Sequence, residues 1–83
     1  MPTLAIFDGI KIQVFNDEHP PPHFHVAFAE HRASILIDTL ELHNGHMPRQ
    51  QLRRVRAWAV TRKDALHKAW SLCLADRNPG KIP

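Results

Sequence analysis

The feature of the sequence that most constrains its fold is a change of hydrophobic periodicity at Pro48. Before this residue, apolar and polar residues alternate, most clearly over residues 10–15 and 23–29. Such alternation is typical of strands with one buried face, whereas the apolar spacing after Pro48 is that of a helix. The pattern predicts an α+β fold: a small antiparallel β-sheet of three to five strands, with one face covered by a long C-terminal helix, continuous or kinked.

Four short strands are expected, over residues 10–15 (preceded by a short segment at 4–7), 23–29, 33–37 and 40–42, with Asn44-Gly45 as a closing turn. Side-chain parity divides them into two faces. The predicted buried face consists of Ile10, Ile12, Val14, Phe24, Val26, Phe28, Ile35, Ile37, Leu40 and Leu42. The predicted polar face consists of Lys11, Gln13, His23, His25, Ser34, Asp38, Glu41 and His43.

The helical region should cover this sheet through one apolar stripe, formed by Leu52, Val55, Ala59, Leu66, Trp70 and Cys73. Arg62 interrupts the stripe, so two arrangements are open: one helix from about Pro48 to Asp76, or two helices with a break near Thr61. We favour the continuous or slightly kinked helix, because the apolar phase is the same on both sides of Arg62.

Eighty-three residues are enough for one domain, 1–83, with residues 1–47 mainly β, 48–76 helical and 77–83 a loose tail. The single cysteine, Cys73, is expected to be a small buried hydrophobe. No apolar run is long enough to cross a membrane, and no secretory signal is visible at the N-terminus. These features predict a cytoplasmic protein with no membrane partner.

The most specific segment is residues 17–26, which contain three histidines, two carboxylates and three consecutive prolines. The prolines should form a stiff extended rod, after which His23 and His25 point to the same side of a strand. His19, His23 and His25 offer imidazole ligands for zinc or a similar divalent metal, and Asp17 or Glu18 could complete the set. The candidate polar site is therefore Asp17, His19, His23 and His25.

Two other interpretations of these histidines stay open. Their rings could simply pack on the prolines and hydrogen-bond the backbone, which would make the segment structural. Alternatively, imidazoles can move protons near neutral pH without a metal. The sequence has no Gly-rich phosphate loop, no G-x-S-x-G, no CxxC and no H-E-x-x-H, so any catalysis would resemble that of a small histidine-based nuclease or phosphodiesterase.

Charge is divided unequally along the chain. Residues 1–47 carry two basic and six acidic side chains, whereas residues 48–83 carry nine basic and two acidic ones. Arg49, Arg53, Arg56 and Lys63 form a band on the helical region away from its apolar stripe, and this band is the candidate anion-binding surface for nucleic acid. The alternative is the ordinary solvated face of an amphipathic helix.

Several motifs together resemble a known bacterial family. These are Asp8-Gly9-Ile10, the stretch from Asp17 through the three prolines to His23-Phe24-His25-Val26, the Gly45-x-x-Pro48 that opens the helical region, and then Trp58, Leu66 and Trp70. Over nearly the whole chain they resemble the domain of unknown function DUF4160, from whose usual Asp-His pair the chain departs by the inserted Glu18. The resemblance implies a small cytosolic bacterial protein with no assigned catalytic residue. It also implies a small protein partner, DUF2442-like, within a toxin–antitoxin-like module.

Two hypotheses of function follow. The first is a non-enzymatic interaction or regulatory module that binds a small protein partner and nucleic acid. The second is a histidine-centred divalent-metal site, either structural or supporting nuclease-like or phosphodiesterase-like chemistry.

Overall fold

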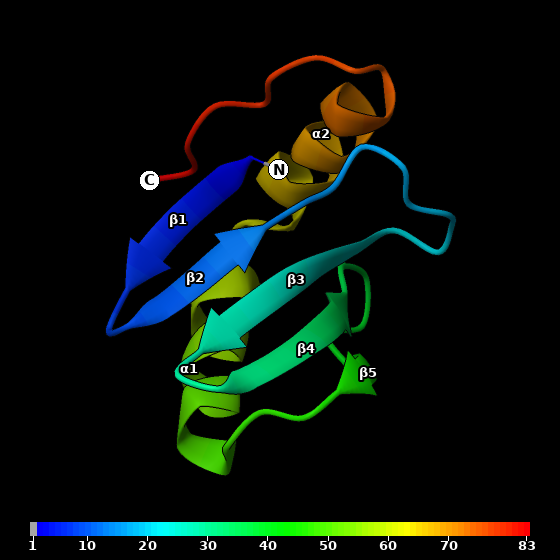
Figure 1. The fold of residues 1–83 in the computed structure, drawn as a ribbon. Helices are drawn as coiled ribbons and strands as arrows, with labels where there is room; N and C mark the ends of the chain where they lie inside the picture. The colour runs from blue at the N-terminus through cyan, green and yellow to red at the C-terminus, as the bar shows by residue number, and fades with distance from the viewer. Residues whose placement is uncertain (1) are drawn as a thin grey trace.

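Five antiparallel strands form one sheet in chain order, and two helices follow them (Figure 1). The computed structural model describes residues 2–83. The elements are β1 (Thr3–Phe7), β2 (Ile10–Gln13), β3 (His23–Phe28), β4 (His31–Leu36), β5 (Leu42–Gly45), α1 (Arg49–Ala59) and α2 (Lys63–Leu74). Both helices lie on the same face of the sheet, so the predicted α+β architecture is confirmed.

The predicted buried face of the sheet is largely confirmed. The side chains of Ile10, Ile12, Phe24 and Ile35 are fully buried, in register across β2, β3 and β4. Leu42 is an exception, since 41% of it is exposed. It begins the edge strand β5, whose pairing with β4 is interrupted by a register shift, so the alternation of faces is not maintained there.

The end of the sheet also differs from the prediction at Leu40 and at Asn44-Gly45. Leu40 is buried, as expected, but it lies in the β4–β5 connection with a positive φ and not in a strand. Asn44 and Gly45 belong to β5 and do not form its closing turn. A Cβ on Gly45 would lie 2.3 Å from the carbonyl oxygen of Arg32, so glycine is required here by the close approach of β4.

The helical region is divided, so the preference for a continuous helix was wrong and the break near Thr61 is what the structure shows. α1 ends at Ala59 and α2 begins at Lys63. Arg62 explains the break: its Nη1 donates to the carbonyl oxygen of Trp58 at 2.7 Å, and its guanidinium lies 5.1 Å from the Trp58 ring centroid. The side chain thus binds the end of α1, while Val55, Ala59, Leu66 and Trp70 still enter one core.

The C-terminal segment, expected to be loose, is attached to the sheet. The Ile82 N–H donates to the carbonyl oxygen of Leu4 at 2.8 Å, and the Ile82 side chain packs against the core. Lys81 Nζ donates to the Thr3 carbonyl oxygen, and Arg62 Nε donates to that of Pro83. Residues 80–83 therefore run along the outer edge of β1 (Figure 1). Among residues 2–83, neither helix has the length and apolar character needed to cross a membrane.

Candidate metal centre

Glu18, His23 and His25 converge at the start of β3. Glu18 lies in the connection between β2 and β3, and the two histidines lie two residues apart on the strand. One potential ligand atom from each residue lies within 4.8 Å of the other two. His23 Nε2 is 3.4 Å from Glu18 Oε2, and His25 Nε2 is hydrogen-bonded to Glu18 Oε1. One carboxylate thus faces two imidazole nitrogens.

The orientation of the His23 ring is fixed by the proline segment. His23 Nδ1 lies 2.8 Å from the carbonyl oxygen of Pro21, and because a carbonyl can only accept, Nδ1 carries the hydrogen. The ring centroid of His23 lies 5.0 Å from that of Trp70 in α2 and 5.3 Å from that of His43. His23 is consequently 6% exposed, although parity had placed it on the polar face of the sheet.

His25 is the more accessible of the two histidines. Its ring packs against Phe15 at a centroid distance of 4.2 Å, and its side chain is 27% exposed, close to the 24% of Glu18. One side of the group is therefore open to solvent while His23 closes the other. A bound ion could exchange with water from this open side.

The structure brings together part of the predicted site. His23 and His25 meet, as predicted, but their carboxylate neighbour is Glu18 and not Asp17. Asp17 and His19 are both exposed and lie outside the group of converging ligand atoms found among residues 2–83. The direction of each side chain in residues 14–22 depends on how this connection folds over β3, and no periodicity in the sequence records that path.

The predicted anion-binding band is only partly free. Arg49 and Arg53 are exposed on α1. In contrast, Arg56 Nε donates to the carbonyl oxygen of Leu40 at 2.9 Å, and Lys63 Nζ donates to that of Asp38 at 2.6 Å. Arg56 and Lys63 thus hold the β4–β5 connection against the helices, a role that the charge pattern alone does not reveal.

Cys73 lies on α2 and is buried in the hydrophobic core, as expected. Burial raises the pKa of its thiol above the ordinary value, because the thiolate would lose its hydration. This thiol is therefore suited to packing and not to ligation.

A family model described as a domain of unknown function (DUF4160) matches residues 9–71, about three-quarters of the chain. The chain belongs to the DUF4160 family. Neither a curated protein nor a solved structure matches it. The part matched to DUF4160 contains Glu18, His23 and His25, together with Trp70 that covers His23.

The donor set of this DUF4160 chain defines what the site can hold. Imidazole nitrogen and carboxylate oxygen are ligands for zinc and for other divalent transition metals. The hydrogen bond from His23 to the Pro21 carbonyl is the arrangement that metal-bound histidines usually have, in which the second ring nitrogen is anchored by the protein. In neutral His23 this leaves the Nε2 lone pair directed toward Glu18.

Proposed function

We propose that this DUF4160 protein binds a divalent metal of the zinc type through Glu18, His23 and His25. The observation that carries the proposal is the convergence of one donor atom from each residue within 4.8 Å. His23 Nε2 and Glu18 Oε2 lie 3.4 Å apart, and a cation bound between them would be coordinated by both, through the Nε2 lone pair of a neutral imidazole and a carboxylate oxygen. We also propose a location in the bacterial cytoplasm, which membership of the DUF4160 family supports.

Two histidines and one glutamate are a ligand set compatible with an open coordination position. When bound, a zinc ion at such a position would act as a Lewis acid and lower the pKa of its water to about 7. The solvent-facing side of His25 and Glu18 is where such a water would lie. The chemistry suited to this arrangement is hydrolysis of an ester or phosphodiester. If a fourth protein ligand filled the open position, the centre would be structural.

The test is metal titration of the untagged, chelator-treated full-length protein with zinc, nickel and manganese, followed by calorimetry. We expect one equivalent of at least one ion to bind, and binding to be lost in the double variant His23→Ala, His25→Ala. The matched control is His31→Ala, His46→Ala, which removes another neighbouring histidine pair, whose ring centroids are 5.4 Å apart. No binding of any ion, or equal binding by the two double variants, would overturn the proposal.

Because His23 is buried, its replacement could unfold the protein. The partly exposed Glu18 provides a second variant, Glu18→Gln, which keeps the shape of the side chain and removes its charge. A folded Glu18→Gln protein that binds the ion as tightly as the wild type also excludes the proposed site.

A second candidate function is an interaction or regulatory module that contacts nucleic acid, and it is favoured by α1. This helix contains four arginines and no acidic residue, and Arg49 and Arg53 are exposed. The four exposed residues of β5 offer a strand edge to a small protein partner of the DUF2442 type within a toxin–antitoxin-like unit.

Fluorescence anisotropy with a labelled duplex tests this candidate at low and physiological salt. Arg49→Gln, Arg53→Gln should weaken binding and flatten its salt dependence, because each phosphate contact releases counterions. The control is Arg77→Gln, Lys81→Gln, which makes the same change of charge outside α1. Equal weakening by both pairs would show that net charge, and not α1, determines the binding.

A further inference from the structure

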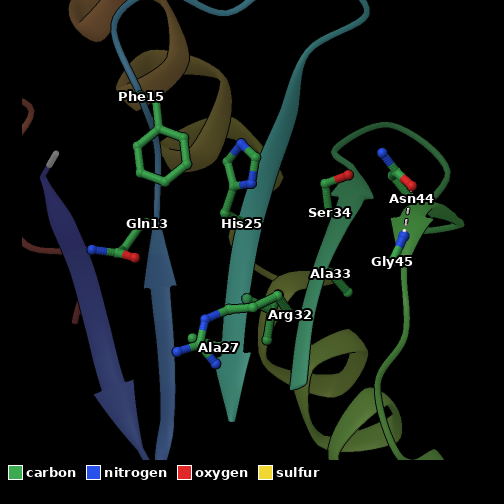
Figure 2. A pocket seen from close by; sticks show the side chains of 10 residues that line it. Gln13, Phe15, His25, Ala27, Arg32, Ala33, Ser34, Asn44 and Gly45 are labelled. Atoms are coloured by element: carbon green, nitrogen blue, oxygen red, sulfur yellow. Dashed lines mark hydrogen bonds between the residues drawn. The ribbon is translucent and has the colours of Figure 1, made fainter. Parts of the chain in front are cut away.

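The open face of the sheet has a hollow directly beside His25 (Figure 2). Its volume is about 430 Å³, and it is lined by residues of β2, β3, β4 and β5 and by Phe15. In Figure 2 both helices lie behind the strands, so the hollow is on the face opposite the core. We call it the sheet trough. Its volume falls within the range of small-molecule sites, roughly 300–1,000 Å³.

Polar side chains cross the trough in one row because the strands pair in register. Gln13 is opposite His25, His25 is opposite Ser34, and Ser34 is opposite Asn44. Neighbouring strands are about 4.8 Å apart, so the row presents an amide, an imidazole, a hydroxyl and a second amide at regular intervals. A ligand lying across the strands would meet both donors and acceptors.

The side chains at the two ends of the trough differ: one end is aromatic and the other is positively charged. Phe15 and His25 stand at the end near the candidate metal centre. At the other end Arg32 extends across Ala27, the residue with which it pairs. Its Nη1 donates to the carbonyl oxygens of Ala29 and His31, both at 2.8 Å, which holds the guanidinium over the sheet.

The trough has a floor formed by the small side chain of Ala27 and a positive group, the guanidinium of Arg32. Ala27 is two residues from His25 on β3, which corresponds to about 7 Å along the strand. Of the residues that the structure describes, no acidic one lines the trough. Beyond Nη1, the Arg32 guanidinium has further N–H groups, and these favour a molecule with an oxyanion at one end.

We propose that the sheet trough binds a small organic oxyanion, a carboxylate or a phosphate ester. Its charged group pairs with Arg32, and a second oxygen reaches the metal held by Glu18, His23 and His25. This inference rests on the proposed metal function and assigns its ligand class. The amide and hydroxyl row orients the rest of the molecule, and the Phe15 ring provides an apolar wall.

The test uses the zinc-loaded full-length protein, with succinate and phenyl phosphate titrated separately by calorimetry. We expect at least one of them to bind, and Arg32→Gln to weaken that binding by about tenfold or more, the loss typical of a charged hydrogen bond. Ala27→Leu should weaken it by filling the floor. Arg54→Gln, which changes an arginine that pairs with Asp8 at 3.4 Å, is the matched control. The probe that binds identifies the carboxylate or the phosphate class.

Zinc titration without either anion separates the two proposals. If zinc binds and neither anion does, the trough inference is wrong and the metal proposal stands. If Arg32→Gln and Arg54→Gln weaken anion binding equally, the trough inference is also wrong. If zinc itself does not bind, the metal proposal fails, and with it the inference that rests on it.

Discussion

His23 Nδ1 donates a hydrogen bond to the carbonyl oxygen of Pro21 over 2.8 Å, and this contact determines which nitrogen His23 presents to Glu18. Pro21 belongs to the same β2–β3 connection as Glu18. Its hydrogen bond with His23 therefore fixes that connection relative to the start of β3. A ligand atom anchored in this way loses little freedom when it binds an ion.

Glu18 should contribute more to metal binding than its neighbour Asp17. Glu18→Gln is expected to weaken zinc binding by at least about tenfold, since loss of an outer-sphere partner alone typically costs about 10–100-fold. Asp17→Asn makes the same charge change one residue away on an exposed side chain and should leave the affinity nearly unchanged. Calorimetric titration of both variants checks this. Equal weakening by the two variants would mean that only the local charge matters.

His19 provides a second comparison around the same segment. His19→Ala should leave both zinc stoichiometry and affinity unchanged, because His19 is exposed and outside the converging group. His25→Ala should reduce the affinity by about tenfold or more, since it removes a direct ligand. Loss of binding in His19→Ala would instead support the ligand set predicted from the sequence.

Gly45 and Gly80 have similar backbone conformations but different surroundings. Their φ angles are +82° and +75°, yet a Cβ would lie 2.3 Å from the Arg32 oxygen at Gly45 and would meet nothing within 4 Å at Gly80. Gly80→Ala should lower the free energy of unfolding by about 1–2 kcal/mol, the cost of the left-handed conformation. Gly45→Ala should cost several kcal/mol more, about 4 in all, or prevent folding. Urea denaturation measures the difference, and similar losses would contradict the tight β4–β5 approach.

Arg56 and Arg53 should differ in their effect on stability. Both side chains are exposed on α1, but Arg56 Nε donates to the carbonyl oxygen of Leu40, and among residues 2–83 no such bond is found for Arg53. Arg56→Gln is expected to lower the free energy of unfolding by about 1 kcal/mol, and Arg53→Gln by no more than about 0.5 kcal/mol. Thermal and urea unfolding of both variants checks this. A larger loss in Arg53→Gln would show that the arginine contacts are assigned wrongly.

The buried Cys73 thiol should make the folded protein less stable at high pH. Burial raises its pKa in the folded protein, so the unfolded chain releases this proton first. Its contribution is complete below the unfolded pKa, about 8.5, and is lost as the pH rises through the folded pKa. Wild type should therefore lose more stability than Cys73→Ala between about pH 7 and about pH 10 in urea denaturation. Parallel curves for the two proteins would exclude this linkage.

The sheet could be predicted because successive side chains of a strand point to opposite faces, so burial of one face appears in the sequence as alternation of apolar and polar residues. Ile10, Ile12, Phe24 and Val26 face one side in the sequence pattern and are fully or nearly fully buried in the structure. The break between the helices could not be predicted in this way, because the apolar phase continues through it. It depends on Arg62, whose partners are the carbonyl oxygens of Trp58 and Pro83, and the second of these is brought near only by the fold.

The candidate site likewise has one part that the local pattern predicts and another that depends on the fold. Parity alone placed His23 and His25 on one side of β3, and the structure brings both together. Glu18 was one of two possible carboxylates, and the choice between Asp17 and Glu18 depends on the path of the connection over the strand. The burial of His23 by Trp70 joins two positions far apart in the chain, and no local pattern records such a contact.

The register of β3 connects the protein's stability to the position of its histidines. A shift of one residue in the pairing of β3 would turn Phe24 and Val26 toward water and bring His25 into the apolar layer. The free energy that excludes this slip comes from the apolar side chains and from the helices that cover them, and not from the polar row. Substitutions of Gln13, His25 and Asn44 can therefore change the chemistry of the open face, while the sheet that aligns these residues folds as before.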